Sequence, residues 1–141
     1  HLLGRPYSLA GEVVAGARRG HCLGYPTANL AVRPERAVPP DGVYAAYAVI
    51  GEERWPAVAN VGERPSFNTG QRAIEVHIIG YRGDLYGRDL VVEFIKRLRP
   101  ERRFEDICEL VQQIGHDIEQ AQRLFAAEEV RAREQDGERV L

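Results

Sequence analysis

The segment of residues 16–30 combines residue types suited to binding phosphate and a divalent cation. Three glycines and two arginines precede the run Pro26-Thr27-Ala28-Asn29. Glycine lets the backbone approach an anion closely and turn its N–H groups toward it. Thr27 and Asn29 offer the neutral oxygens that Mg²⁺ accepts, and residues two apart in an extended segment point to the same face. The segment could therefore hold phosphates and their metal, although a plain surface loop is the commoner role of glycine-rich sequence.

Glu75 is the candidate for proton transfer. Strict alternation over residues 73–79 predicts a strand with isoleucine and valine on one face and Glu75 and His77 on the other. A carboxylate in a cleft could act as a general base toward a hydroxyl, opposite the phosphates and the metal. By pattern alone, a half-exposed strand with polar residues in water is the commoner interpretation. We interpret His77 as a supporting or structural residue rather than a catalytic one.

Aromatic and basic residues form a third candidate group. Tyr86 and Phe104 could stack on planar rings, and Arg99 or Arg102 could bind a planar acceptor or a phosphate. Alone, these segments also fit a hairpin turn and a strand-to-helix junction. The chain has one lysine, Lys96, and no GxxxxGK[ST] phosphate loop, so phosphate chemistry here would depend on backbone amides, arginine and a metal.

Short strands must position these residues. Turn signals separate six candidate strands, at Leu9–Val14, near Asn29–Val32, and at Val43–Ile50, Arg54–Asn60, Ala73–Ile79 and Asp89–Arg97. Strands without helical crossovers predict a mainly-β antiparallel barrel or sandwich. Apolar residues at three- and four-residue steps then predict one amphipathic helix from Phe104 to Phe125. We expect one domain over residues 1–127 and a charged, frayed tail over 128–141.

The bulk properties argue against several classes of partner. A net charge of −2 without long runs of like charge argues against nucleic acid and anionic membranes. Two distant cysteines indicate a reduced, cytoplasmic protein. No apolar run approaches the ~20 residues of a membrane span. The absence of methionine indicates a piece of a longer protein or a trimmed chain.

Seven segments together resemble the riboflavin kinase (flavokinase) family, in family order and across nearly the whole chain. They are Gly11-Glu12-Val13-Val14, the glycine-rich segment into Pro26-Thr27-Ala28-Asn29-Leu30, Gly42-Val43-Tyr44, Asn60-Val61-Gly62-Glu63-Arg64-Pro65, Glu75-Val76-His77-Ile78, Leu85-Tyr86-Gly87 and Leu98-Arg99-Pro100-Glu101. The opening Leu2-Leu3-Gly4-Arg5-Pro6-Tyr7 resembles the start of the kinase module in bacterial bifunctional riboflavin kinase/FMN adenylyltransferases.

The resemblance implies a six-stranded Greek-key β-barrel with a C-terminal helix. It implies transfer of the ATP γ-phosphoryl group to the 5′-hydroxyl of riboflavin, which gives FMN and ADP. It also implies that an adenylyltransferase domain precedes this module in the full protein. This chain alone should not make FAD, because the sequence before residue 1 would carry that activity.

The resemblance also implies a role for each candidate residue. Glu75 would be the catalytic base, and Thr27 and Asn29 would hold Mg²⁺ with ATP. The ATP site would comprise Gly16, Arg18, Gly20, Thr27 and Tyr86, and the flavin site would comprise Arg99, Arg102 and Phe104. Some relatives carry a lysine shortly before Pro26, where this chain has arginines and His21.

Two alternative functions are compatible with the same predicted barrel. A non-catalytic flavin-binding or regulatory module would be expected to lose the metal and base positions, whereas Thr27, Asn29 and Glu75 are all present. A nucleic-acid-binding barrel is disfavoured by the acidic balance.

Overall fold

Six strands and a long helix make up the described part of the chain. The computed structural model describes residues 2–14, 28–31, 38–63, 72–101 and 107–140. The elements in chain order are β1 Leu2–Val14, β2 Ala28–Ala31, β3 Gly42–Ile50, β4 Glu53–Glu63, β5 Arg72–Ile78, β6 Asp89–Arg99 and α2 Ile107–Val140. Among these residues no helix is both long and apolar enough to cross a bilayer.

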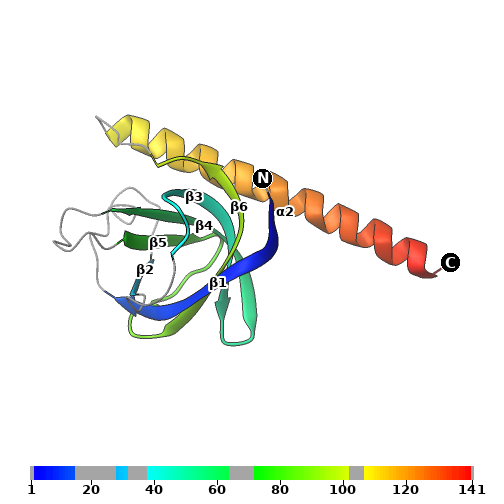
Figure 1. Cartoon of the computed structure of the whole chain (residues 1–141), viewed down its shortest axis with the longest axis horizontal. Helices are drawn as coiled ribbons and strands as arrows, with labels where there is room; N and C mark the ends of the chain where they lie inside the picture. The colour runs from blue at the N-terminus through cyan, green and yellow to red at the C-terminus, as the bar shows by residue number, and fades with distance from the viewer. Residues whose placement is uncertain (1, 15–27, 32–37, 64–71, 102–106, 141) are drawn as a thin grey trace.

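The strands close into one antiparallel barrel in the order β1-β2-β5-β4-β3-β6 (Figure 1). Strands β3, β4 and β5 are consecutive neighbours, and β6 returns to lie beside β3, which is the Greek-key order. The predicted mainly-β Greek-key barrel with a C-terminal helix is therefore confirmed.

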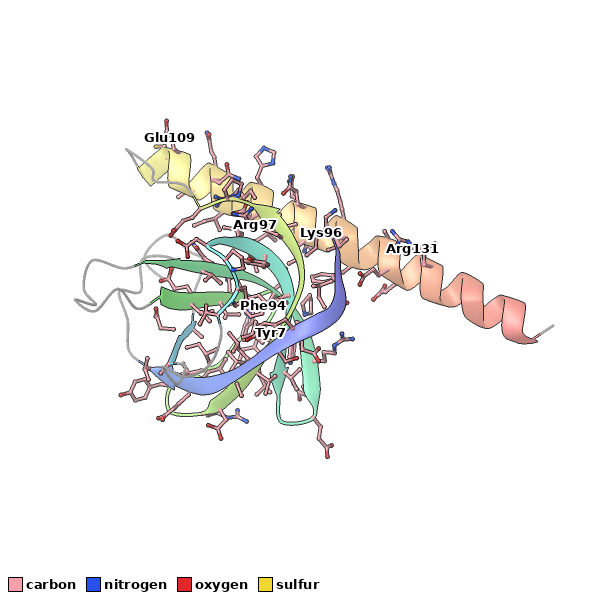
Figure 2. All side chains as sticks on the ribbon, in the orientation of Figure 1. Tyr7, Phe94, Lys96, Arg97, Glu109 and Arg131 are labelled. Carbon is pink, nitrogen blue, oxygen red and sulfur yellow. The ribbon has the colours of Figure 1, made fainter. Side chains whose placement is uncertain are left out.

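Side-chain alternation fills the barrel interior. Along β5, Ile74, Val76 and Ile78 are buried and point inward, as the period of two predicts. Phe94 of β6 lies inside the barrel and meets the ring of Tyr44 edge-on, with the centroids 5.2 Å apart (Figure 2). Inward-facing positions of this kind hold the closed sheet together by burying apolar surface.

Helix α2 covers part of the outer face of the barrel. The helix packs Ala121 and Phe125 against the outward side chains of β3, β4 and β6, among them Val43, Val58 and Ile95. Because β3 is covered on both faces, its sequence is apolar almost throughout. In Figure 1 the helix runs along one side of the barrel and continues past it, and Figure 2 shows Arg131 on the projecting part.

Two elements are longer than the sequence pattern predicts. Strand β1 starts at Leu2 rather than Leu9, because its first residues pair with β6 across an irregularity in register. Helix α2 continues to Val140, whereas the pattern predicts a frayed tail from Glu128. That segment is rich in glutamate and arginine, which favour helix even without an apolar stripe.

Candidate functional site

One row of cross-strand partners runs from β1 to β6 along the barrel wall and contains three of the predicted site residues. Strand pairing makes each member the direct partner of the next, in the order Val14, Asn29, Glu75, Asn60, Val43 and Arg99. Neighbouring strands lie about 4.8 Å apart, so the three steps from Glu75 to Arg99 span about 14 Å around the barrel. The fold thus places these predicted residues in one continuous row of strand partners.

The row points away from the barrel interior. Ala28 and Leu30 flank Asn29 and contact the interior cluster, and Ile74 and Val76 do the same on either side of Glu75. Because successive side chains on a strand point to opposite faces, Asn29 and Glu75 face outward. In Figure 1 the strands that carry them, β2 and β5, lie side by side in the barrel wall.

Asn29 and Glu75 are the predicted metal ligand and the predicted base, and they are direct partners across β2 and β5. Directly opposite residues in an antiparallel pair have Cβ atoms about 4.5–5.5 Å apart. Asn29 is 9% exposed, and the Oε1 atom of Glu75 is fully buried. The simple picture of a strand with polar side chains in open water therefore does not describe this face.

Asn60 stands on the other side of Glu75, on β4, and sequence reasoning did not select it as a site residue. It is the direct partner of Glu75, and its Oδ1 atom is buried without a hydrogen-bond partner among the described residues. A buried carbonyl oxygen without a donor is uncommon in folded proteins. The only signal in the sequence was its place at the head of the Asn60–Pro65 segment.

Arg99 lies at the far end of the row, where α2 covers the barrel. Its Nε and one terminal nitrogen each donate to Asp117 of α2 at 2.8 Å, and its other terminal nitrogen donates to the carbonyl of Pro100 at 3.1 Å. Asp117 is 3% exposed and also accepts a hydrogen bond from Gln113 at 3.0 Å. The helix therefore fixes the orientation of this predicted flavin-binding side chain.

Glu101 brings a second carboxylate toward the row. Its carboxylate rests against Gly62, at the spot where any larger residue would place its Cβ atom. Gly62 follows Asn60 by two positions on β4, so both occupy the same face of the strand. The segment after β6 therefore packs on the face of β4 that carries Asn60.

Tyr86, predicted in the nucleotide site, lies in a turn fastened to the opposite end of the row. The N–H of Gly87 donates to the carbonyl of Val13, and the N–H of Val13 donates to the carbonyl of Arg88, both at 2.9 Å. Within the turn, the Tyr86 N–H donates to Asp84 Oδ1 at 2.9 Å, and the Tyr86 side chain is 61% exposed. An exposed ring beside β1 is available to stack on a planar ligand.

Six of the predicted site residues lie outside the described residues. They are Gly16, Arg18, Gly20, Thr27, Arg102 and Phe104. Thr27 immediately precedes Ala28, the first residue of β2. His77, interpreted as a supporting residue, is half-buried and pairs with Val58 of the helix-covered face.

The oxygens at this site fit a hard cation such as Mg²⁺. Asn29 contributes a buried carboxamide, with a carboxylate directly beside it. Mg²⁺ is usually held by one or two protein oxygens together with water and substrate phosphates. Among the described residues no cluster of three histidine, cysteine, aspartate or glutamate side chains could hold a metal alone.

Comparison with known proteins gives a consistent family assignment. The model of the flavokinase (riboflavin kinase) family matches residues 3–125. The bifunctional riboflavin kinase/FMN adenylyltransferase of Bacillus subtilis is 40% identical over 128 residues, which are 89% of this chain and 40% of that protein. The chain thus spans about two-fifths of the curated relatives that it matches.

Two solved structures share the fold. Riboflavin kinase from Trypanosoma brucei superposes with a TM-score of 0.67 over 89% of this chain and 82% of its own, at 22% identity. A Streptococcus pneumoniae protein named as a macrolide-efflux protein superposes with a TM-score of 0.78 over 83% of this chain and 38% of its own, at 34% identity.

Proposed function

Because the chain belongs to the riboflavin kinase family, we propose that it transfers the γ-phosphoryl group of ATP to the 5′-hydroxyl of riboflavin. The products are FMN and ADP. The observation that carries the proposal is the direct pairing of Asn29 with Glu75, since it joins an oxygen ligand for the metal to a carboxylate base. Phosphoryl transfer depends mainly on such positioning and on charge neutralisation.

Glu75 acts on the acceptor hydroxyl. The carboxylate accepts the proton of the 5′-hydroxyl as the hydroxyl oxygen bonds to the γ-phosphorus. The bond between that phosphorus and the β–γ bridging oxygen breaks, and ADP leaves with the bond's electron pair. The position of Glu75, half-buried and beside Asn29, suits a base that works next to bound phosphates.

Asn29 and Thr27 are the residues we propose to hold Mg²⁺ together with ATP. When bound, the cation neutralises charge on the phosphate oxygens. The backbone of Asn29 is held between β1 and β5, which fixes where its carboxamide starts.

The two substrates would approach the row from its two ends. At the Val14 end, we propose that Gly16, Arg18, Gly20, Thr27 and Tyr86 bind ATP. At the other end, we propose that Arg99, Arg102 and Phe104 bind the flavin. The hydrogen bonds of the Val13–Gly87 region and the Arg99–Asp117 ion pair support this division, because each anchors one end.

The full protein is proposed to be larger than this chain. The curated relatives are named as bifunctional riboflavin kinase/FMN adenylyltransferases, and this chain corresponds to about 40% of their length. We propose that an adenylyltransferase domain accompanies this module in a cytoplasmic enzyme.

Formation of FMN tests the proposal directly. The chain is incubated with riboflavin, ATP and Mg²⁺, and the flavins are separated by chromatography, with a reaction lacking ATP as control. FMN that appears only with ATP supports the kinase. Tight riboflavin binding without FMN would instead favour the non-catalytic flavin-binding module, and the absence of both would contradict each function.

A further inference from the structure

We propose that Asn60 is a substrate-contacting residue whose Oδ1 atom accepts a hydrogen bond from a hydroxyl of the acceptor's polyol chain, next to the hydroxyl that reacts. The inference rests on the proposed function and adds a contact that the sequence did not predict. Two independent observations carry it: the position of Asn60 in the row, and the burial of its Oδ1 atom without a hydrogen-bond donor among the described residues.

Asn60 lies in the row between Glu75, the proposed base, and Arg99, the proposed flavin-binding residue. On one side it pairs directly with Glu75, and on the other side the row continues through Val43 to Arg99. A substrate that presents its terminal hydroxyl to Glu75 and its ring system toward Arg99 must pass Asn60. The part of riboflavin between these two points is the polyol chain, which is rich in hydroxyl groups.

Chemistry points to a donor as the missing partner. The Oδ1 atom of a carboxamide is an acceptor only, and here it is buried without a donor among the described residues. A buried acceptor without a partner is unfavourable in the free protein. A ligand that supplies the donor would therefore gain binding free energy from this hydrogen bond. A hydroxyl can donate one hydrogen bond while it still accepts others, which makes a polyol a suitable ligand.

The side chains near Asn60 also suit contact with a polar chain. Glu101 packs on Gly62, two residues along the same face of β4, so another acceptor group lies close to Asn60. Glu75 stands on the opposite side. The surroundings of Asn60 are thus oxygen-rich on two sides, whereas the inward face of the same strand is apolar.

A substrate-and-residue cycle tests the contact. Asn60→Ala and the parent protein are each assayed with riboflavin and with 4′-deoxyriboflavin, which lacks the hydroxyl adjacent to the reacting one. We expect Asn60→Ala to lower kcat/KM for riboflavin by about tenfold. With the deoxy substrate, the two proteins should agree within about twofold, because the hydroxyl that Asn60 contacts is already absent. If the role of Asn60 were purely structural, the substitution would lower kcat/KM equally for both substrates.

Dissociation constants and thermal unfolding complete the test. For the same two proteins and two flavins, the flavin Kd is measured by fluorescence quenching in the presence of Mg·ADP. This measurement does not require turnover. Gln122→Ala, at an exposed position of α2, serves as the matched control and should behave as the parent. Asn60→Ala should unfold at the parent temperature or above it, since the change removes a buried acceptor that has no donor among the described residues.

Two results would overturn the inference. One is that Asn60→Ala leaves kcat/KM and Kd for riboflavin unchanged. The other is that Asn60→Ala lowers kcat/KM equally for riboflavin and 4′-deoxyriboflavin. Failure of the proposed function looks different, because the parent protein itself would then form no FMN from riboflavin.

Discussion

Arg99 and Asp117 form a two-bond ion pair that joins the end of β6 to the first third of α2, with both N···O distances at 2.8 Å. The Asp117 side chain is 4% exposed and that of Arg99 is 18% exposed. Removing one member of such a pair leaves the other charge poorly solvated. The ion pair therefore sets the position of the helix as well as the orientation of Arg99.

We expect Asp117→Ala to lower the free energy of unfolding by about 2–3 kcal/mol. Asp117→Asn should cost less, because an amide oxygen still accepts a hydrogen bond from Arg99. Chemical denaturation followed by circular dichroism measures both. The control is Glu119→Ala, at an exposed position two residues away, which should stay within about 0.5 kcal/mol of the parent. Equal stability of Asp117→Ala and the parent would contradict the role of the ion pair.

Replacing the proposed base should separate catalysis from binding. Glu75→Gln keeps the size of the side chain but removes the basic carboxylate, so kcat for FMN formation should fall by about 10²–10⁴-fold. Binding of riboflavin and of Mg·ADP, measured by fluorescence and calorimetry, should change little. FMN formation by Glu75→Gln at the parental rate would exclude Glu75 as the base.

Asn29 should control the requirement for Mg²⁺. Asn29→Ala removes a buried oxygen beside Glu75, and the Mg²⁺ concentration for half-maximal FMN formation should rise by about tenfold or more. Asn29→Asp, which retains an oxygen ligand, should recover most of the affinity. Calorimetric titration of ADP with and without Mg²⁺ provides a second reading. An identical Mg²⁺ dependence in Asn29→Ala would argue against metal binding at this residue.

Two glycines of the barrel should respond differently to the same substitution. A Cβ atom at Gly11 of β1 would collide with the backbone carbonyl of Ala31 in β2, which cannot move without breaking the strand pairing. Gly11→Ala should therefore lower the free energy of unfolding by about 2 kcal/mol. At Gly62 the collision is only with the flexible carboxylate of Glu101, so Gly62→Ala should cost less than about 1 kcal/mol. Thermal unfolding compares the two, and an equal loss in both would contradict this account.

Much of the barrel follows from local pattern. The alternation of Ile74, Val76 and Ile78 predicts β5 and its inward face, and that prediction is confirmed. The apolar spacing from Phe104 to Phe125 predicts an amphipathic helix, and α2 is that helix, with Ala121 and Phe125 packed on the barrel. These features depend on the side-chain period of each element, which is readable within a short window.

The pairings between distant strands are not readable in this way. Nothing in the alternation of β2 or β5 indicates that Asn29 and Glu75 share a register position, because register depends on the closure of the whole barrel. Asn60 looks like any outward polar residue until its neighbour across the strand is known. Asp117 was not selected from the sequence either, and its partner is 18 residues away on β6.

Stability at alkaline pH should depend on two tyrosines of β3, of which Tyr44 is buried and Tyr47 is half-buried. Burial raises the pKa of Tyr44 and Tyr47 above the ordinary value of 10.0, with Arg97 and Arg54 respectively opposing part of the effect. The Tyr44 hydroxyl donates to the carbonyl of Pro40 at 2.7 Å, and the guanidinium of Arg54 lies 3.6 Å above the Tyr47 ring.

The sign of the effect follows from proton release. Above about pH 10 the unfolded chain loses tyrosine protons that the folded chain retains, so the free energy of unfolding decreases as pH rises toward the raised folded values. Below about pH 10 these two groups contribute no pH dependence. Denaturation from about pH 8 to about pH 11 measures the slope, and absorbance of the phenolate follows ionisation. In the double variant Tyr44→Phe/Tyr47→Phe the decline between the two ends of this range should be smaller than in the parent. An identical decline would show that other groups govern alkaline stability.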